Sequence, residues 1–306
     1  MPTSLEMQLR AVLGPPTART PRRTSSGQGQ RHPAPAAMEA GPKLVYKRYS
    51  IFPSERSRGV PTQLTDMHCP ITIYMDESGN GNPGQPLIVG AVVVDANSGD
   101  IEADIRQMYR ELSARRSLRG HKGFEKFRKS GFHASTDPTE VSQPFIELLQ
   151  RSGGFKVYLM ATSQHAYRGL TEAQVISEMY ETIIADNLIR YRGQAAMTVC
   201  IEENDSLRSM LRNLPRFAAS RAITKLGTHV KLPEIRVEMV KKGSVMSLAI
   251  TDYAMLATSR WISSNFATDP SGRAYRGFRE IAPTISLLYS LEDGKLASRK
   301  SRFEEA

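Results

Sequence analysis

The stretch ITIYMDESGNGNPGQPLIVGAVVVD, residues 71–95, places a glycine-rich turn between two apolar runs. Both runs are rich in β-branched residues and have the length of a strand. The turn between them is too short for a crossover helix, so the two strands are predicted to pair as an antiparallel hairpin. The first strand ends on two adjacent acids, Asp76 and Glu77. Their mutual repulsion indicates a place where negative charge has a use.

Three more strand-like runs follow, and they alternate with helical stretches. The runs are FKVYLMAT (155–162), AAMTVCIEE (195–203) and EIRVEMV (234–240). Helical periodicity is found at about 100–117, 139–152, 170–192, 206–226 and 244–263. Strands that alternate with helices favour an α/β fold, so we predict a mixed five-stranded sheet with helices on its faces.

The composition changes along the chain and predicts its organisation. Residues 1–42 are rich in Pro, Ser, Arg and Gly and are expected to be disordered. This segment resembles a transit peptide, but we prefer the interpretation that Met38 is the true start. Residues 43–70 are interpreted as an arm or linker, 71–290 as the folded domain and 291–306 as a charged tail.

The overall totals favour a cytoplasmic protein with a polyanionic partner. The 306 residues carry 41 Lys and Arg against 31 Asp and Glu, a net charge of +10. A basic balance of this kind is compatible with nucleic acid. The two cysteines, Cys69 and Cys200, fit no disulfide framework or zinc motif. No apolar run is long enough to span a membrane.

Acids close two of the predicted strands. Asp76 and Glu77 end the first, and Glu202 and Glu203 end the run AMTVCI. Strand ends are where α/β proteins commonly build sites. The alternatives are structural: an acidic turn entry for the first pair, and charges that favour a helix N-terminus for the second.

A third acid, Asp252, lies within the helical stretch SVMSLAITDYAMLATSRW, where its neighbours at three and four positions are apolar. A carboxylate on an apolar helix face is costly unless it is paired, protonated or bound to a metal. The alternative to a functional role is a structural pair with Lys or Arg.

Together, Asp76, Glu202 and Asp252 form an all-oxygen set suited to Mg²⁺ or Mn²⁺. Two such ions would support phosphodiester cleavage, which agrees with the basic charge. His133, in the segment SGFHAST, is a candidate for proton transfer near the scissile phosphate. An ordinary loop histidine is the simpler interpretation of His133.

Basic residues gather in two places that could contact phosphates. The densest is the segment ARRSLRGHKGFEKFRKS, in which cations alternate with Phe124 and Phe127. The cations could contact phosphates and the two rings could stack on bases. A solvated charged loop between helices would have the same sequence pattern. The candidate contacts of this segment are Arg115, Arg116, Arg119, Lys122, Lys126, Arg128 and Lys129. Arg208, Arg212 and Arg216 recur every four residues and would form a basic stripe on one helix, unless Pro215 breaks it.

Four motifs occur in an order that resembles the domain of unknown function 3800 family. They are YMDESGNG (74–81), FHAS (132–135), VCIEEND (199–205) and SVMSLAITDYAMLA (244–257), and the likeness covers about residues 71–265. The resemblance implies a ribonuclease H-like (retroviral integrase-like) fold. It also implies that two divalent ions are held by Asp76, Glu202 and Asp252, with Glu77 and His133 matching the family's other motif residues.

The sequence departs from that family at two positions. Gly131 replaces an acid two residues before the histidine, and Ala249 replaces a glutamine in the helix motif. Such groups orient metal ligands, so their loss favours a divergent subfamily. We therefore predict a two-metal nuclease acting on DNA or RNA. The alternatives are an inactive nucleic-acid-binding module of the same fold, or an interaction subunit that docks a protein partner in a larger assembly.

Overall fold

The computed structural model describes residues 71–95, 100–163, 169–204, 207–227, 230–241, 243–266, 268–291 and 296–298. All of them belong to one compact unit, Ser50–Ala306. The predictions of a disordered segment at 1–42 and an arm at 43–70 lie outside the described residues. Among the described residues, no helix is both long and apolar enough to cross a membrane.

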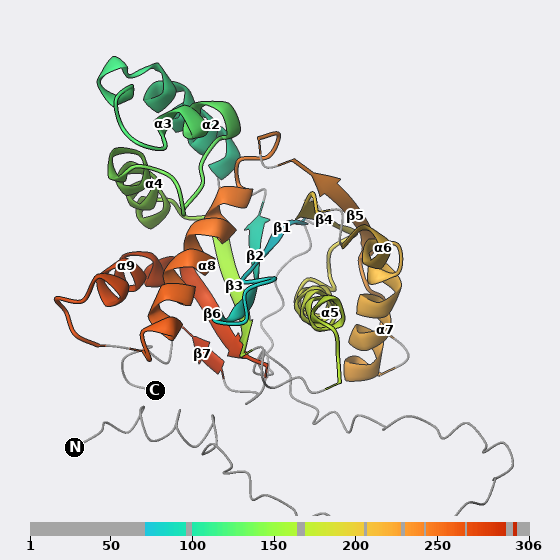
Figure 1. The fold of residues 1–306 in the computed structure, drawn as a ribbon. Coiled ribbons are helices and arrows are strands. Elements are labelled where there is room, and N and C mark those ends of the chain that lie inside the picture. The colour runs from blue at the N-terminus through green and yellow to red at the C-terminus, as the bar shows by residue number, and fades with distance from the viewer. Residues whose placement is uncertain are drawn as a thin grey trace, which may run out of the picture. The chain divides into compact units, whose positions relative to one another are not determined.

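One mixed sheet organises this unit (Figure 1). Its strands are β1 (Ile71–Ser78), β2 (Leu87–Asp95), β3 (Phe155–Thr162), β4 (Ala196–Glu202), β5 (Glu234–Val240), β6 (Ile285–Ser290) and β7 (Leu296–Ser298). Their order across the sheet is β5-β4-β1-β2-β3-β6-β7. The hairpin partners β1 and β2 are antiparallel, β2 and β3 are antiparallel, and β4 and β5 run parallel to β1. The predicted fold class, a mixed sheet flanked by helices, is confirmed.

The strand count of five was too low. β6 pairs parallel with β3, and β7 pairs antiparallel with β6. β6 is only six residues long and directly follows helical turns, so local periodicity gives it little weight. β7 lies inside the stretch interpreted as a charged tail, and the sheet therefore extends past the predicted boundary at residue 290.

Four of the five predicted helices are confirmed, the fifth is divided in two, and further helical elements are present. The expected ones are α2 (Ile101–Ala114), α4 (Thr139–Arg151), α5 (Glu172–Arg190) and α8 (Leu248–Ser263). The single helix predicted at 206–226 is two, α6 (Arg208–Leu211) and α7 (Leu214–Leu226), because Pro215 begins a new helix. The additional helical elements are α3 (Phe124–Ser130), α9 (Arg273–Ile281), and the 3₁₀ turns η2 (Arg116–Leu118) and η4 (Ala282–Thr284).

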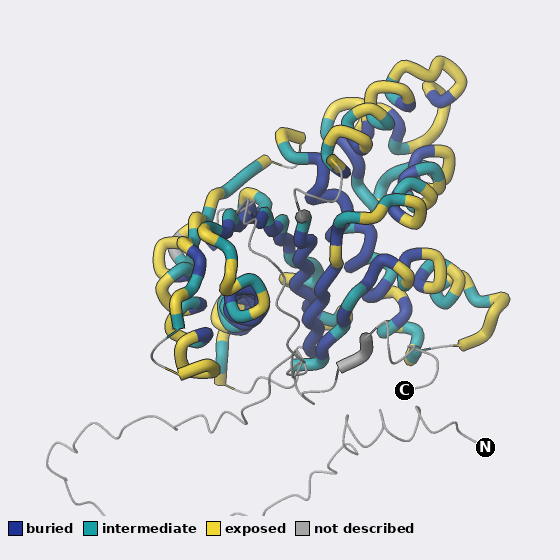
Figure 2. Tube along the Cα trace, turned by 180° about the vertical axis from the view of Figure 1, so that it is seen from behind, coloured by how far each residue is buried: buried dark blue, intermediate teal, exposed yellow. Residues whose placement is uncertain are grey.

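Each face of the sheet has its own apolar core. On one face, the α5 core packs Ile73 and Met75 of β1 against helices that include α5 and α7. On the other face, the α8 core packs Ile88 and Val92 of β2 against helices that include α2, α4, α8 and α9. Figure 2 shows that the central strands are buried, whereas exposed residues gather on the outer helices and the edge strand β5 is partly exposed.

Helix α8 is fixed at both of its ends. At its beginning, Glu102 of α2 accepts hydrogen bonds from the backbone N–H groups of Met246 and Ser247, at 3.0 and 2.7 Å. Near its end, the ring of Trp261 stacks on Phe278 of α9 with centroids 4.1 Å apart and planes inclined by 8°. Because both ends are held, the middle of α8 has a defined position over the sheet.

Candidate functional site

The two acids at the end of β1 point to opposite faces of the sheet. Successive strand residues alternate between faces. Ile73 and Met75 belong to the α5 core, whereas Tyr74 packs against the α8 core. Asp76 therefore points to the α8 face and Glu77 to the α5 face, so the pair is divided between two environments.

Neutral donors hold Glu77 on the α5 face. The Tyr180 hydroxyl donates to Glu77 Oε2 at 2.6 Å, and the Asn204 amide donates to Oε1 at 2.7 Å. Tyr180 is on α5 and is fully buried, and Asn204 follows β4. Both carboxylate oxygens of Glu77 are thereby engaged, which suits a supporting role and ties the ends of β1 and β4 together.

Glu202 lies beside Asp76 at the same edge of the sheet. β1 and β4 are parallel, with Met75 opposite Ile201, so Asp76 and Glu202, the residues that follow these two, are neighbours across the strands. Ile201 belongs to the α5 core, which places Glu202 on the α8 face with Asp76.

The electrostatics of Tyr180 agree with this placement. Burial raises the pKa of the Tyr180 hydroxyl well above its ordinary value, and the carboxylates of Glu77, Asp76 and Glu202 raise it further. One hydroxyl thus experiences all three acids, as expected if the ends of β1 and β4 concentrate negative charge.

Glu203 has a structural partner instead. Its carboxylate lies 3.4 Å from the Arg208 guanidinium, and its backbone N–H donates to the Val240 carbonyl at 3.0 Å. This agrees with the structural alternative for the second residue of the pair.

Asp252 reaches the same face of the sheet from α8. This helix packs on β1 and β2, and Met255 lies so close to Gly90 that a Cβ on the glycine would be 3.1 Å from the methionine side chain. Gly90 is the β2 partner of Asp76. Asp252 is one helical turn before Met255, so it faces the same side of the sheet as Asp76 and Glu202.

The His133 loop, residues 131–138, covers Asp252. The Ala134 backbone N–H donates to Asp252 Oδ2 at 3.1 Å, and His133 Nδ1 lies 3.7 Å from the same oxygen. The His133 and Asp252 side chains are only 24% and 21% exposed. The predicted association of His133 with the acids is thus consistent with the geometry at Asp252.

Sequence reasoning missed Asp137 in this loop. Its Oδ2 accepts hydrogen bonds from the His133 backbone N–H at 2.7 Å and from the Tyr253 hydroxyl at 2.6 Å. Burial raises the pKa of the Asp137 carboxyl from 3.8 to about 6, against these hydrogen bonds and the charge of His133, which lower it. The sequence does show an acid four residues after His133. Its local pattern, however, is the same as that of an ordinary acid in a turn.

The two departures from the family motifs have structural reasons. Gly131 ends α3 with a φ of +82°, a conformation that residues with a Cβ rarely adopt. Ala249 is 1% exposed within the α8 core. In this chain Gly131 allows the backbone conformation that ends α3, and Ala249 fills a place in the α8 core.

The acids fit a hard cation in donor chemistry, since Asp76, Glu202 and Asp252 offer only carboxylate oxygens. Within the described parts of the chain, however, no three or more His, Cys, Asp or Glu side chains form a group that could hold a metal ion. Binding would therefore require these carboxylates to turn toward one another.

The basic segment is exposed, but its aromatic residues are not. All seven cations between Arg115 and Lys129 are exposed, whereas Phe124 and Phe127 are 0% exposed. The hypothesis that these rings stack on bases is therefore wrong: both rings belong to the α8 core and anchor α3. The continuous basic stripe of Arg208, Arg212 and Arg216 is also wrong, because the helix ends and restarts between Arg212 and Leu214.

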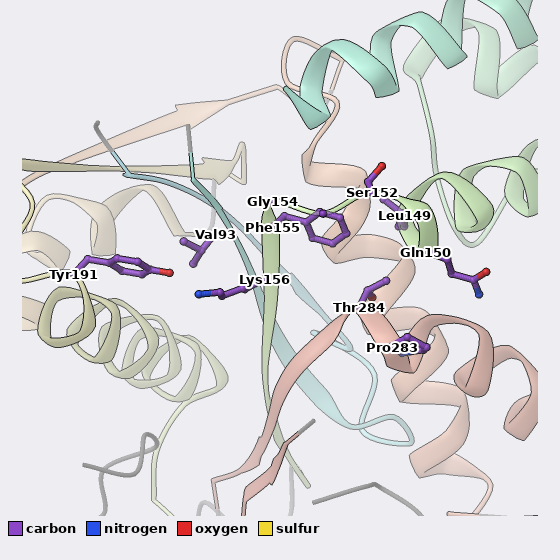
Figure 3. Close-up of a pocket in the computed structure, with 11 residues that line it drawn as sticks. Val93, Leu149, Gln150, Ser152, Gly154, Phe155, Lys156, Tyr191, Pro283 and Thr284 are labelled. Carbon is purple, nitrogen blue, oxygen red and sulfur yellow. The ribbon is translucent and has the colours of Figure 1, made fainter. Parts of the chain in front are cut away.

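A cavity of about 390 Å³ lies elsewhere, at the beginning of β3 (Figure 3). Lys156 and Tyr191 lie on one side of the strand, and Phe155 and Thr284 on the other. The carboxylates are at the opposite end of the sheet, since β3 runs antiparallel to β2 and its beginning faces Val94. This cavity is separate from the candidate site.

Comparisons with known proteins find likenesses among solved structures. No protein-family model and no curated protein matches this sequence. A chain of the complex of PCNA with RNase HII from Archaeoglobus fulgidus aligns over 67% of this chain and 85% of its own length, at 13% identity and a TM-score of 0.36. The ribonuclease H2 of Pyrococcus horikoshii OT3 aligns over 69% and 99%, at 10% identity and a TM-score of 0.33.

Proposed function

We propose that this protein is a metal-dependent nuclease that hydrolyses phosphodiester bonds. The observation that supports the proposal is that acids from three elements lie on one face of the sheet: Asp76 and Glu202 toward the ends of two adjacent parallel strands, and Asp252 on the helix that packs on that face. Carboxylates from separate elements on one face are expected of a built site and not of a turn or a helix cap. The sequence motifs that resemble the domain of unknown function 3800 family support the same function.

Each residue has a distinct task in this proposal. Asp76, Glu202 and Asp252 would hold two Mg²⁺ or Mn²⁺ ions, which when bound would activate water and stabilise the leaving oxygen. Glu77 fixes the spacing of β1 and β4 through Tyr180 and Asn204. His133, beside Asp252, would transfer a proton to the leaving oxygen.

The exposed cations between Arg115 and Lys129 would contact the phosphate backbone. They belong to η2, α3 and the adjoining turns, and α3 leads through Gly131 and Phe132 directly to His133. A strand of nucleic acid bound to these cations would thus meet the loop that covers Asp252. Contacts of this kind are made to the backbone, so they leave the choice between DNA and RNA open.

The test is cleavage of labelled DNA, RNA and hybrid substrates with Mg²⁺, Mn²⁺ or EDTA. We expect activity only with metal, and we expect it to be lost in Asp76→Asn and in Asp252→Asn. Asp269→Asn serves as a control, because Asp269 is an exposed turn acid hydrogen-bonded to Ser271. Nucleic acid bound equally by parent and variants, with no substrate cut, would instead identify an inactive binding module.

A further inference from the structure

We propose that Asp137 is a positioning residue that fastens the His133 loop to helix α8. One carboxylate oxygen joins the two elements, because Asp137 Oδ2 accepts from the His133 backbone N–H at 2.7 Å and from the Tyr253 hydroxyl at 2.6 Å. Tyr253 is the α8 residue next to Asp252. The catalytic part of this inference rests on the proposed nuclease function, whereas the structural part does not.

The loop on which Asp137 acts is a compact turn. The backbone N–H groups of Thr136 and Asp137 both donate to the His133 carbonyl, at 3.1 and 2.9 Å. The turn also packs tightly on the beginning of α3: a Cβ on Gly123 would lie 2.0 Å from the Thr136 carbonyl oxygen. A turn with these restraints moves as one body, so its attachments to α8 determine where His133 lies.

Two carboxylates hold successive N–H groups of this loop. Asp137 accepts from His133, and Asp252 accepts from Ala134 at 3.1 Å. If Asp252 turns toward a cation, its bond to Ala134 is weakened. Asp137 would then be the remaining carboxylate that holds the loop beside α8 and keeps His133 near the reacting phosphate.

The second oxygen of Asp137 argues against direct contact with substrate. Within the described residues, Asp137 Oδ1 is buried and has no hydrogen-bond partner. An oxygen enclosed by the protein is not presented to nucleic acid. Asp137 therefore acts through His133, and its loss should alter the loop before it alters binding.

The experiment combines backbone amide exchange, measured by NMR, with steady-state kinetics of the full chain. The variants are Asp137→Ala, which removes both hydrogen bonds, and Tyr253→Phe, which removes only the one to α8. The matched control is Asp269→Ala, because Asp269 also accepts from a backbone N–H and a hydroxyl, both of Ser271, far from the loop in sequence.

We expect the exchange rates of the His133 and Ala134 amides to rise about tenfold or more in Asp137→Ala, while α5 amides remain protected. We expect kcat to fall about 10- to 100-fold with little change in KM, as for groups that orient catalytic residues. Tyr253→Phe should show the same changes to a smaller degree, and the control should show neither. Tyr253→Phe also tests the proposal if Asp137→Ala does not fold.

Unchanged exchange at His133 and Ala134 in folded variants would overturn the positioning role. A raised KM with unchanged kcat would also overturn it, because Asp137 would then contribute to binding. If the parent protein cuts no substrate, the nuclease proposal fails, and the amide exchange still decides whether Asp137 fastens the loop.

Discussion

Two regions of the fold hold their buried acids differently. Between α5 and α7, acids are matched with cations: Lys225 Nζ lies 2.6 Å from Asp186, and the Arg221 guanidinium lies 3.7 and 3.8 Å from Glu178 and Glu181. These pairs join α5 to α7.

Around the ends of β1 and α8, the acids are held by N–H and hydroxyl groups instead. Glu77 accepts from Tyr180 and Asn204, and Asp137 accepts from His133 and Tyr253. The ion pairs of the described residues include neither Glu77 nor Asp137. An acid paired with a lysine has its charge neutralised within the fold, whereas acids held by neutral donors leave a region of negative potential, as a divalent cation requires.

The largest effect is expected from the carboxylates on the α8 face. Asp76→Asn should reduce metal-dependent cleavage at least about a hundredfold, which corresponds to about 3 kcal/mol of transition-state stabilisation. Thermal unfolding with and without Mg²⁺ provides a second readout, because the ion should raise the melting temperature of the parent and not of the variant. Equal stabilisation of both proteins by Mg²⁺ would remove the contrast between the paired acids of α5 and the acids held by neutral donors.

A comparable effect on stability, without an effect on the site, is expected at Lys225. Asp186 is 1% exposed, so Lys225→Met should lower the free energy of unfolding by about 3 kcal/mol, because it leaves a buried carboxylate without this cation. Urea unfolding measures the change. The control is Arg236→Met, since Arg236 pairs with Glu234 while both are about two-thirds exposed, and its loss should cost less than about 1 kcal/mol. Loss of cleavage in a stable Lys225→Met protein would contradict a purely structural role for the ion pairs between α5 and α7.

A smaller effect is expected where the two environments meet, at Tyr180. Tyr180→Phe removes the hydroxyl that donates to Glu77 and should cost about 2 kcal/mol of stability, as for hydrogen bonds to charged groups. Because Glu77 also fixes β4 through Asn204, we expect a weaker response to Mg²⁺ as well. Tyr275→Phe is the control, since Tyr275 lies on α9 and its hydroxyl accepts from Arg279 at the surface. If Tyr180→Phe has the stability and metal response of the parent, the hydrogen bond from Tyr180 is not needed to position Glu77.

The smallest effect is a pH dependence from Asp137. Its pKa in the folded protein, about 6, exceeds the ordinary value of 3.8, so the native state binds this proton more tightly than the unfolded state does. The resulting stabilisation is full below pH 4 and is lost as the pH rises through 6. We expect a loss of about 1 kcal/mol, after discounting for solvent near the side chain. Urea unfolding in EDTA at pH 4 and pH 7 should show it in the parent and not in Asp137→Asn. An equal pH dependence in both proteins would assign the effect to another group.

Local patterns predicted most of the sheet and less of the site. The five predicted strands are confirmed because their apolar runs are long and bounded by turns. β6 was missed because it is short, and the split between α6 and α7 depends on one proline. Phe124 and Phe127 were misjudged because a helix of seven residues between cations does not show locally that one face is buried.

The parts of the site that could not be predicted depend on distant contacts. Glu102 fixes the start of α8 from about 145 residues away, and Asp137 is tied to Tyr253 from 116 residues away. Nothing in the sequence near either acid indicates its partner. In contrast, Asp76 and Glu77 were noticeable at once, because two acids at the end of an apolar strand contradict its pattern.

The stacked ring at the end of α8 gives this protein an optical reporter. Trp261 is the only tryptophan of the chain and is 4% exposed between Phe278 and Phe266. Its fluorescence therefore comes from one place, the junction of α8 with α9, about 14 Å along the helix from Asp252. An emission spectrum that shifts to the red would report separation of these helices. Any variant of the carboxylates can thus be checked for an intact α8 without a label, before its activity is measured.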